Sequence, residues 1–194
     1  MSGETSRKDK LKIKDVITVV LLALINIVIF GLSTFLYLTP ITILLMPVFF
    51  GLTEGIVFFI IGTKVKKRGA IIIYCIVRGI LGVYIPYVVL YLLSGVIAEI
   101  LLWKMGYGSA KGLTLSYVIL QVLAGLGSTI IPFTIAFQSQ LKMMGDTVGG
   151  RTDNIIAAHN MIKGWGWIIL VIVIIGVSFL GALIGKKIVK KHLE

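Results

Sequence analysis

Three ionisable residues lie inside long apolar stretches of this chain: Glu54, Arg78 and Glu99. Charged side chains are costly in hydrocarbon, so they usually pair with one another, face the protein interior or line a pathway. Glu54 lies ten residues before the basic segment KVKKR and Arg78 lies ten residues after it, which places both about 15 Å into a membrane at about 1.5 Å per helical residue. We therefore predict a buried Glu54–Arg78 ion pair. The alternative is that Arg78 contacts an anionic substrate while Glu54 holds it in place.

Three tyrosines at helical spacing, Tyr84, Tyr87 and Tyr91, lie near the predicted outer surface. They suit either an interfacial aromatic belt or a wall on which a planar ligand stacks. Gln121 and Gln138 lie within and just beyond the fifth apolar stretch, where their amides can orient a ligand by hydrogen bonds. We include all five, with Arg78, among the predicted substrate-binding residues.

A histidine in the polar segment 138–167 offers a different chemistry. His159 shares this segment with Met143, Met144 and Met161. Imidazole and thioether groups are axial ligands of haem iron, so one interpretation is a haem-like substrate; the other is an ordinary surface histidine. The predicted substrate-binding set is completed from this segment by Asn154, Asn160 and Trp165.

Membrane helices must position these residues, because the composition is far from that of soluble domains. Of the 194 residues, 58% are hydrophobic, and the mean hydropathy is +1.05. A membrane helix needs about 20 apolar residues, so the chain has room for roughly six spans. We predict an all-α integral membrane protein with one domain, 1–194, made of a basic N-terminus (1–14), six transmembrane helices (15–185) and a basic tail (186–194).

Apolar runs predict spans near 15–36, 41–62, 70–83, 86–103, 113–137 and 162–185. The third run is short for a full span. Pro47 and Pro132 interrupt the second and fifth runs, where kinks are tolerated if neighbouring helices satisfy the freed backbone groups. Glu99 lies close enough to the end of its span that we expect it to reach headgroups or water.

The net charge of +11 comes from short basic clusters between apolar runs, a pattern typical of cytoplasmic loops rather than of nucleic-acid binding. If both termini are cytoplasmic, 15 of the 19 Lys and Arg residues lie on the inner side. We therefore expect both ends inside, with one long extracellular loop, 138–167, between helices 5 and 6.

Small residues four positions apart mark faces where membrane helices approach closely. Gly51 and Gly55 form such a face in the second run, and Gly181 and Gly185 form one in the sixth. These faces serve packing inside the chain or docking on a partner, and we name the four glycines as candidate docking residues.

No catalytic or metal-binding motif is present in the sequence. It lacks the P-loop, HExxH and GxSxG patterns, and its single cysteine, Cys75, has no His or Cys neighbour at metal-ligand spacing. We expect neither an enzyme nor a cofactor or metal site, and we interpret Cys75 as a packing residue.

The chain resembles the substrate-binding S components of energy-coupling factor (ECF) transporters, and more narrowly the Trep_Strep family of bacterial membrane proteins. The resemblance rests on six predicted spans in 194 residues, on the segment GLTEGIVFFIIGTKVKKRGAI and on the ending GALIGKKIVKKHLE. It implies a subunit of the bacterial plasma membrane that captures a micronutrient, vitamin-like or haem-like, from outside. It also implies docking on a separate transmembrane coupling subunit driven by two cytoplasmic ATPases.

One feature departs from this resemblance. S components often dock through an Ala-x-x-x-Ala face on the first helix, whereas Ala23 is followed four residues later here by Ile27.

Two other classes of function also stay open. One is an ion-coupled secondary transporter that uses Glu54 and Arg78 as a relay, although the paired repeats typical of that class are missing. The other is an accessory membrane scaffold.

Overall fold

The computed structural model describes residues 10–80, 84–145 and 152–190, and within these ranges the chain is helical and contains no strand. Five helical segments are long and apolar enough to cross a membrane. The predicted all-α membrane class is therefore confirmed at this level. In chain order the elements are α2 (Ile13–Leu32), η1 (Ser33–Leu38), α3 (Pro40–Leu44), α4 (Met46–Lys64), α5 (Ala70–Ile80), α6 (Ile85–Met105), α7 (Ala110–Gly125), η2 (Leu126–Ile130), α8 (Ile131–Phe133), α9 (Phe137–Gly145), α10 (Thr152–Ile162) and α11 (Gly166–Ile188).

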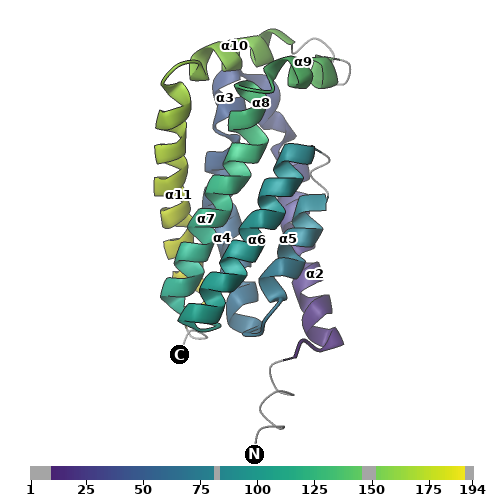
Figure 1. Ribbon diagram of the computed structural model, residues 1–194, viewed down its shortest axis with the longest axis vertical. Coiled ribbons are helices and arrows are strands. Elements are labelled where there is room, and N and C mark those ends of the chain that lie inside the picture. The colour runs from purple at the N-terminus through teal and green to yellow at the C-terminus, as the bar shows by residue number, and fades with distance from the viewer. Residues whose placement is uncertain (1–9, 81–83, 146–151, 191–194) are drawn as a thin grey trace, which may run out of the picture.

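The long helices and α5 pack into a bundle along the long axis of the molecule (Figure 1). Each helix of the bundle contacts the next one in the order α2, α5, α6, α7, α11 and α4. A contact between α4 and α2 closes the ring. The start of α2 and the end of α11 lie at the same end of the bundle, and α3 and α8 to α10 lie at the other (Figure 1).

The third predicted span differs from the others in length. α5 has 11 residues, Ala70 to Ile80, which is about 16 Å of helix, or roughly half of a bilayer core. Its neighbour α6 has 21 residues and extends about 31 Å. The last turn of α5 therefore lies at mid-bundle, and Arg78 belongs to that turn. The predicted boundary at 83 lies outside the described residues.

Prolines divide the second and fifth predicted spans. The second becomes α3 and α4, which meet at Leu45, and Pro47 occupies the first turn of α4, where its missing N–H costs nothing. The fifth runs from α7 through the π-helical turn η2 into α8, and Pro132 lies in α8. A Cβ on Gly127, within η2, would lie 2.7 Å from the Tyr87 Cα. The absence of a side chain there lets the start of α6 pack closely against η2.

The connection between the fifth and sixth predicted spans is not the plain loop expected from its polarity. It contains α9 and α10, which lie across the end of the bundle (Figure 1). α10 is amphipathic: Ile155, Ala158 and Ile162 are buried in one cluster with Ile43 and Leu44 of α3. Helical spacing of apolar residues within a polar segment was the signal that the sequence prediction missed.

The end of the bundle that carries the basic clusters is held by two acidic side chains. Asp15 accepts a hydrogen bond from the Lys12 N–H and forms a 2.6 Å ion pair with Lys67. Glu99 Oε1 accepts from the Gly69 N–H at 2.5 Å and from the Tyr107 hydroxyl at 2.9 Å. These bonds connect the segments that follow α4 and α6.

The expectation that Glu99 reaches water is wrong, because its side chain is only 6% exposed. Both of its hydrogen bonds go to Oε1, and among the described residues Oε2 has no partner. One of the donors is the backbone of Gly69, whose φ of +92° favours glycine. Burial and the hydrogen bond to Glu99 raise the pKa of the Tyr107 phenol. Tyr107 therefore stays protonated and donates at any physiological pH.

The four glycines predicted to dock on a partner pack against each other instead. A methyl group on Gly55 would meet the Gly181 carbonyl, one on Gly181 would meet the Gly51 carbonyl, and one on Gly185 would meet the Gly55 carbonyl. All four are buried between α4 and α11. The docking prediction is wrong at these positions, because the two small-residue faces are covered by one another.

This contact predicts a position-specific effect of added methyl groups on α11. Gly181→Ala is expected to destabilise the protein by about 1–3 kcal/mol, because the obstructing atom is a backbone oxygen that no rotamer change can move. Gly176→Ala is the matched control: nothing lies within 4 Å of its Cβ position, so a gain of up to about 1 kcal/mol in helix propensity is expected. Thermal unfolding in detergent measures both, and equal melting temperatures would contradict the close contact.

Candidate functional site

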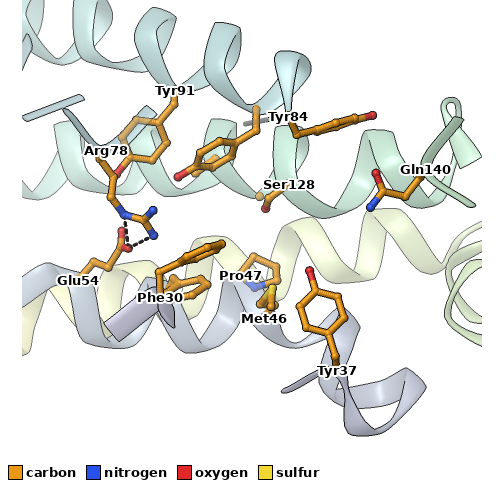
Figure 2. Close-up of a pocket in the computed structure, with 14 residues that line it drawn as sticks. Phe30, Tyr37, Met46, Pro47, Glu54, Arg78, Tyr84, Tyr91, Ser128 and Gln140 are labelled. Atoms are coloured by element: carbon orange, nitrogen blue, oxygen red, sulfur yellow. Dashed lines mark hydrogen bonds and ion pairs between the residues drawn. The ribbon is translucent and has the colours of Figure 1, made fainter. Parts of the chain in front are cut away.

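A cavity of about 250 Å³ lies inside the bundle. It reaches from Glu54 and Arg78 at mid-bundle toward Tyr37 and Gln140 near the end formed by α3 and α9 (Figure 2). Its walls come from α2, η1, α4, α5, α6, α7, η2 and α9, and many of the lining side chains are aromatic. The lining residues are Phe30, Tyr37, Met46, Pro47, Phe50, Glu54, Arg78, Tyr84, Tyr87, Tyr91, Ala124, Gly125, Ser128 and Gln140.

The floor of the cavity is an ion pair between α4 and α5. Arg78 donates to Glu54 Oε1 from Nη2 at 2.7 Å and from Nε at 3.1 Å (Figure 2). Glu54 is 1% exposed and Arg78 is 3% exposed. Both therefore lie in a region where an unpaired charge would be strongly unfavourable.

The second carboxylate oxygen of Glu54 is also engaged. Gln121 Nε2 donates to Glu54 Oε2 at 3.0 Å and to the Tyr117 hydroxyl at 3.2 Å. The Tyr117 hydroxyl in turn donates to the Gly51 carbonyl at 2.9 Å. Gln121, which the sequence assigned to the substrate, thus lies beneath the floor and supports Glu54.

Two phenylalanines cover the guanidinium of Arg78. Its Cζ lies 5.1 Å from the ring centroid of Phe30 and 5.6 Å from that of Phe50, within the range of cation–π attraction. The two rings stack on each other with centroids 5.8 Å apart. Sequence reasoning missed both residues, because a phenylalanine within an apolar run gives no signal that separates it from lipid-facing neighbours.

Two tyrosines of α6 and Tyr84, the residue just before it, form one side of the cavity. Tyr84, Tyr87 and Tyr91 all line it, and Tyr87 and Tyr91 are buried with ring centroids 5.1 Å apart. The Tyr91 hydroxyl donates to the Tyr74 hydroxyl at 3.3 Å, and Asn26 Nδ2 donates to the same oxygen at 2.8 Å. Tyr87 and Tyr91 therefore lie in the bundle interior, as a ligand wall requires, and not on the lipid-facing surface of a belt.

The other residues predicted to bind substrate lie outside this cavity. Gln138, Asn160 and Trp165 are exposed, with Trp165 79% exposed. Asn154 Nδ2 donates to the Leu38 carbonyl at 3.0 Å and so joins α10 to the end of η1. None of these four is among the lining residues.

His159 is committed to a structural contact. Its Nδ1 lies 2.7 Å from the Phe133 carbonyl, and its ring stacks on Phe137 with centroids 3.9 Å apart. Met161 is half exposed, and the side chains of Met143 and Met144 lie outside the described residues. Within the described ranges there is no group of three or more His, Cys, Asp or Glu residues that could hold a metal ion.

The floor predicts strong coupling between two substitutions. Arg78→Met leaves the Glu54 carboxylate buried without its cation and should cost about 3–5 kcal/mol, and Glu54→Gln should also destabilise. The double variant should be less destabilised than the sum of the singles by about 1–3 kcal/mol. Unfolding in detergent measures this difference, and additivity within about 0.5 kcal/mol would show that the pair is not coupled.

The ion pair between Asp15 and Lys67 is the control for this comparison of single and double variants. It has a similar length, 2.6 Å, but lies at the more exposed end of the bundle. Because water screens such pairs, Asp15→Asn and Lys67→Met should couple by at most about 1 kcal/mol.

Comparison with known proteins identifies the family. A family model described as "Hypothetical bacterial integral membrane protein (Trep_Strep)" matches residues 13–194. The chain matches no curated protein and no solved structure. Since the match covers nearly the whole chain, including both halves of the ion pair and every wall of the cavity, this protein belongs to the Trep_Strep family of bacterial integral membrane proteins.

Proposed function

We propose that this chain is the substrate-capturing S component of an ECF-type importer for a small, vitamin-like micronutrient. The observation that carries the proposal is the cavity: it is enclosed by the bundle, lined largely by aromatic rings and closed at mid-membrane by a neutralised ion pair. Ligand sites are typically apolar hollows with a few fixed polar groups, and this one has that character. The sequence has no P-loop, so the ATPases of such an importer would be separate chains.

The lining favours a flat ligand without net charge. Among the described residues that line the cavity, Arg78 is the one with a positive charge, and its ion pair with Glu54 neutralises that charge. Tyr84, Tyr87 and Phe50 offer ring faces for stacking. The volume of about 250 Å³ lies below the range of about 300–1,000 Å³ for drug-sized ligands, which favours a small molecule over a haem-like one.

The position of His159 also argues against the haem-like substrate. Its ring stacks on Phe137, and its Nδ1 contacts the Phe133 carbonyl outside the cavity lining. An axial ligand would have to leave both contacts. We therefore retain the vitamin-like class of substrate.

The orientation follows from charge. The basic segments 64–68, 104–111 and 186–190 lie at one end of the bundle, and Tyr37 and Gln140 mark the end of the cavity farther from them. With the basic end in the cytoplasm, the cavity lies toward the outer face. That arrangement suits capture from outside the bacterial plasma membrane.

Docking on a coupling subunit needs another surface, since the glycine faces are covered. Ala23 is buried in the core and offers no replacement. The outer side of α2 carries a stripe at helical spacing of exposed apolar residues: Ile17, Leu21, Leu24 and Val28. We propose that this stripe meets the coupling subunit.

Substrate retention tests the cavity assignment. Ser128→Leu places extra volume among the lining residues and should reduce binding of the small molecule that co-purifies with the protein by about tenfold, since overpacking costs about 1–3 kcal/mol. Trp165→Ala is the control, because the structure puts this predicted site residue outside the cavity. Mass spectrometry of the bound fraction gives the ratio, and equal retention by both variants would contradict the assignment.

Partner co-purification separates the S component from the alternatives. A complex with a transmembrane coupling protein and two ATPases supports the proposal. Substrate flux in proteoliposomes containing this chain alone would instead favour an ion-coupled transporter with Glu54 and Arg78 as a relay. Absence of both a ligand and flux would favour an accessory scaffold.

A further inference from the structure

A second hollow, separate from the central cavity, lies on the surface of the bundle. It measures about 390 Å³, and the described residues that border it belong to α7 and α11. The two helices are in contact and run side by side (Figure 1). Both are long enough to cross a membrane, so this groove opens toward lipid.

The groove has one cationic end and one apolar end. Lys111, in the first turn of α7, and Lys186, in the last turn of α11, border it where the basic loops lie. From Lys111 to Val118 and from Lys186 to Phe179 the walls extend seven residues into the membrane, about 10 Å of helix. The apolar walls are Leu115, Val118, Phe179 and Leu183.

The two lysines have no acidic neighbour on their own helices. Neither α7 nor α11 contains an Asp or Glu. The salt bridges among the described residues join Asp15 to Lys67 and Glu54 to Arg78. Lys67 at the same end of the bundle is thus neutralised, whereas neither Lys111 nor Lys186 forms a salt bridge within the part of the chain that the structure describes.

We propose that this groove binds one anionic phospholipid. Its phosphate would lie between the Lys111 and Lys186 ammonium groups, and one acyl chain would lie along Val118 and Phe179. The charge of the groove indicates the headgroup, because basic hollows between membrane helices on the cytoplasmic side bind anionic lipid headgroups. The apolar walls indicate an acyl chain, because they continue directly from the lysines and extend over about two-thirds of the hydrocarbon thickness of one leaflet. A soluble anion would use only the lysines and leave the apolar walls without a role.

Native mass spectrometry of the full chain in mild detergent tests the proposal. The probes are phosphatidylglycerol and phosphatidylcholine with identical acyl chains. The wild-type protein should retain one phosphatidylglycerol, and Lys111→Ala with Lys186→Ala should lower that retention by about tenfold. Equal retention of the two lipids by the wild type would overturn the proposal.

Two further variants separate a built site from diffuse charge. Lys104→Ala with Lys187→Ala removes the same charge from exposed positions at the same end that do not border the groove, and should leave retention unchanged. Val118→Trp fills the acyl part while keeping both lysines, and should release the lipid. If both double variants lose lipid equally, or if Val118→Trp retains it, the groove does not bind a phospholipid. Melting temperatures within a few degrees of wild type show that the variants are folded.

Discussion

The buried pair of Glu54 and Arg78 is the constraint on which the membrane part of this protein depends. Two charges at mid-bundle are tolerable only when their hydrogen bonds are satisfied together. Arg78 supplies two donors to one carboxylate oxygen, Gln121 supplies one to the other, and Tyr117 connects Gln121 to the backbone of α4. Three helices, α4, α5 and α7, are therefore fixed to one another at a single depth.

That network also explains the shape of the space above it. The described part of α5 stops at Ile80, two residues after Arg78, and within the described ranges this place in the ring is filled by a helix of only 11 residues. The aromatic side chains of neighbouring elements, Phe30, Phe50 and Tyr87, border the resulting space without closing it. On the opposite side, α4 and α11 approach so closely that glycines are required. One face of α4, with Gly51 and Gly55, is thus packed without room for a methyl group, while another face, with Phe50 and Glu54, borders the cavity.

Sequence reasoning found the elements whose signals are local. Apolar runs predicted the long helices, Pro47 and Pro132 predicted their interruptions, and symmetric spacing about KVKKR placed Glu54 and Arg78 at one depth. It failed where the answer depends on which faces meet. A small-residue face looks the same whether it packs on its own chain or on a partner, and the sequence offered no reason to choose α11 over another protein.

The cavity was predicted in part for the same reason. The tyrosine spacing on α6 identified Tyr84, Tyr87 and Tyr91 as a set, but only tertiary contacts distinguish a ligand wall from an interfacial belt. Phe30 and Tyr37 reach the cavity from elements remote in sequence. The polar segment 138–167 contributed several predicted site residues, because surface loops are common sites of function, and none of those residues lines this cavity. Its helices instead pack their apolar faces on α3 and α8 and cover the end of the bundle.

The two ends of the bundle differ in the interactions that hold them: charges predominate at one end and apolar contacts at the other. This difference predicts which end faces the cytoplasm. At the basic end, Asp15 neutralises Lys67 and Glu99 accepts from the Gly69 N–H and the Tyr107 hydroxyl, while the lysines that border the groove between α7 and α11 are placed to meet anionic lipid. At the other end few charges are present, and α10 is held by apolar contacts such as that of Ile155. With anionic lipid bound as proposed, the first end is held at the membrane surface by charge, whereas α10 at the second end is held by packing and by the contacts of Asn154 with the Leu38 carbonyl and of His159 with the Phe133 carbonyl. Any opening of the central cavity is therefore expected to involve the end covered by α9 and α10, since moving the other end would separate lysines from the lipid surface that attracts them.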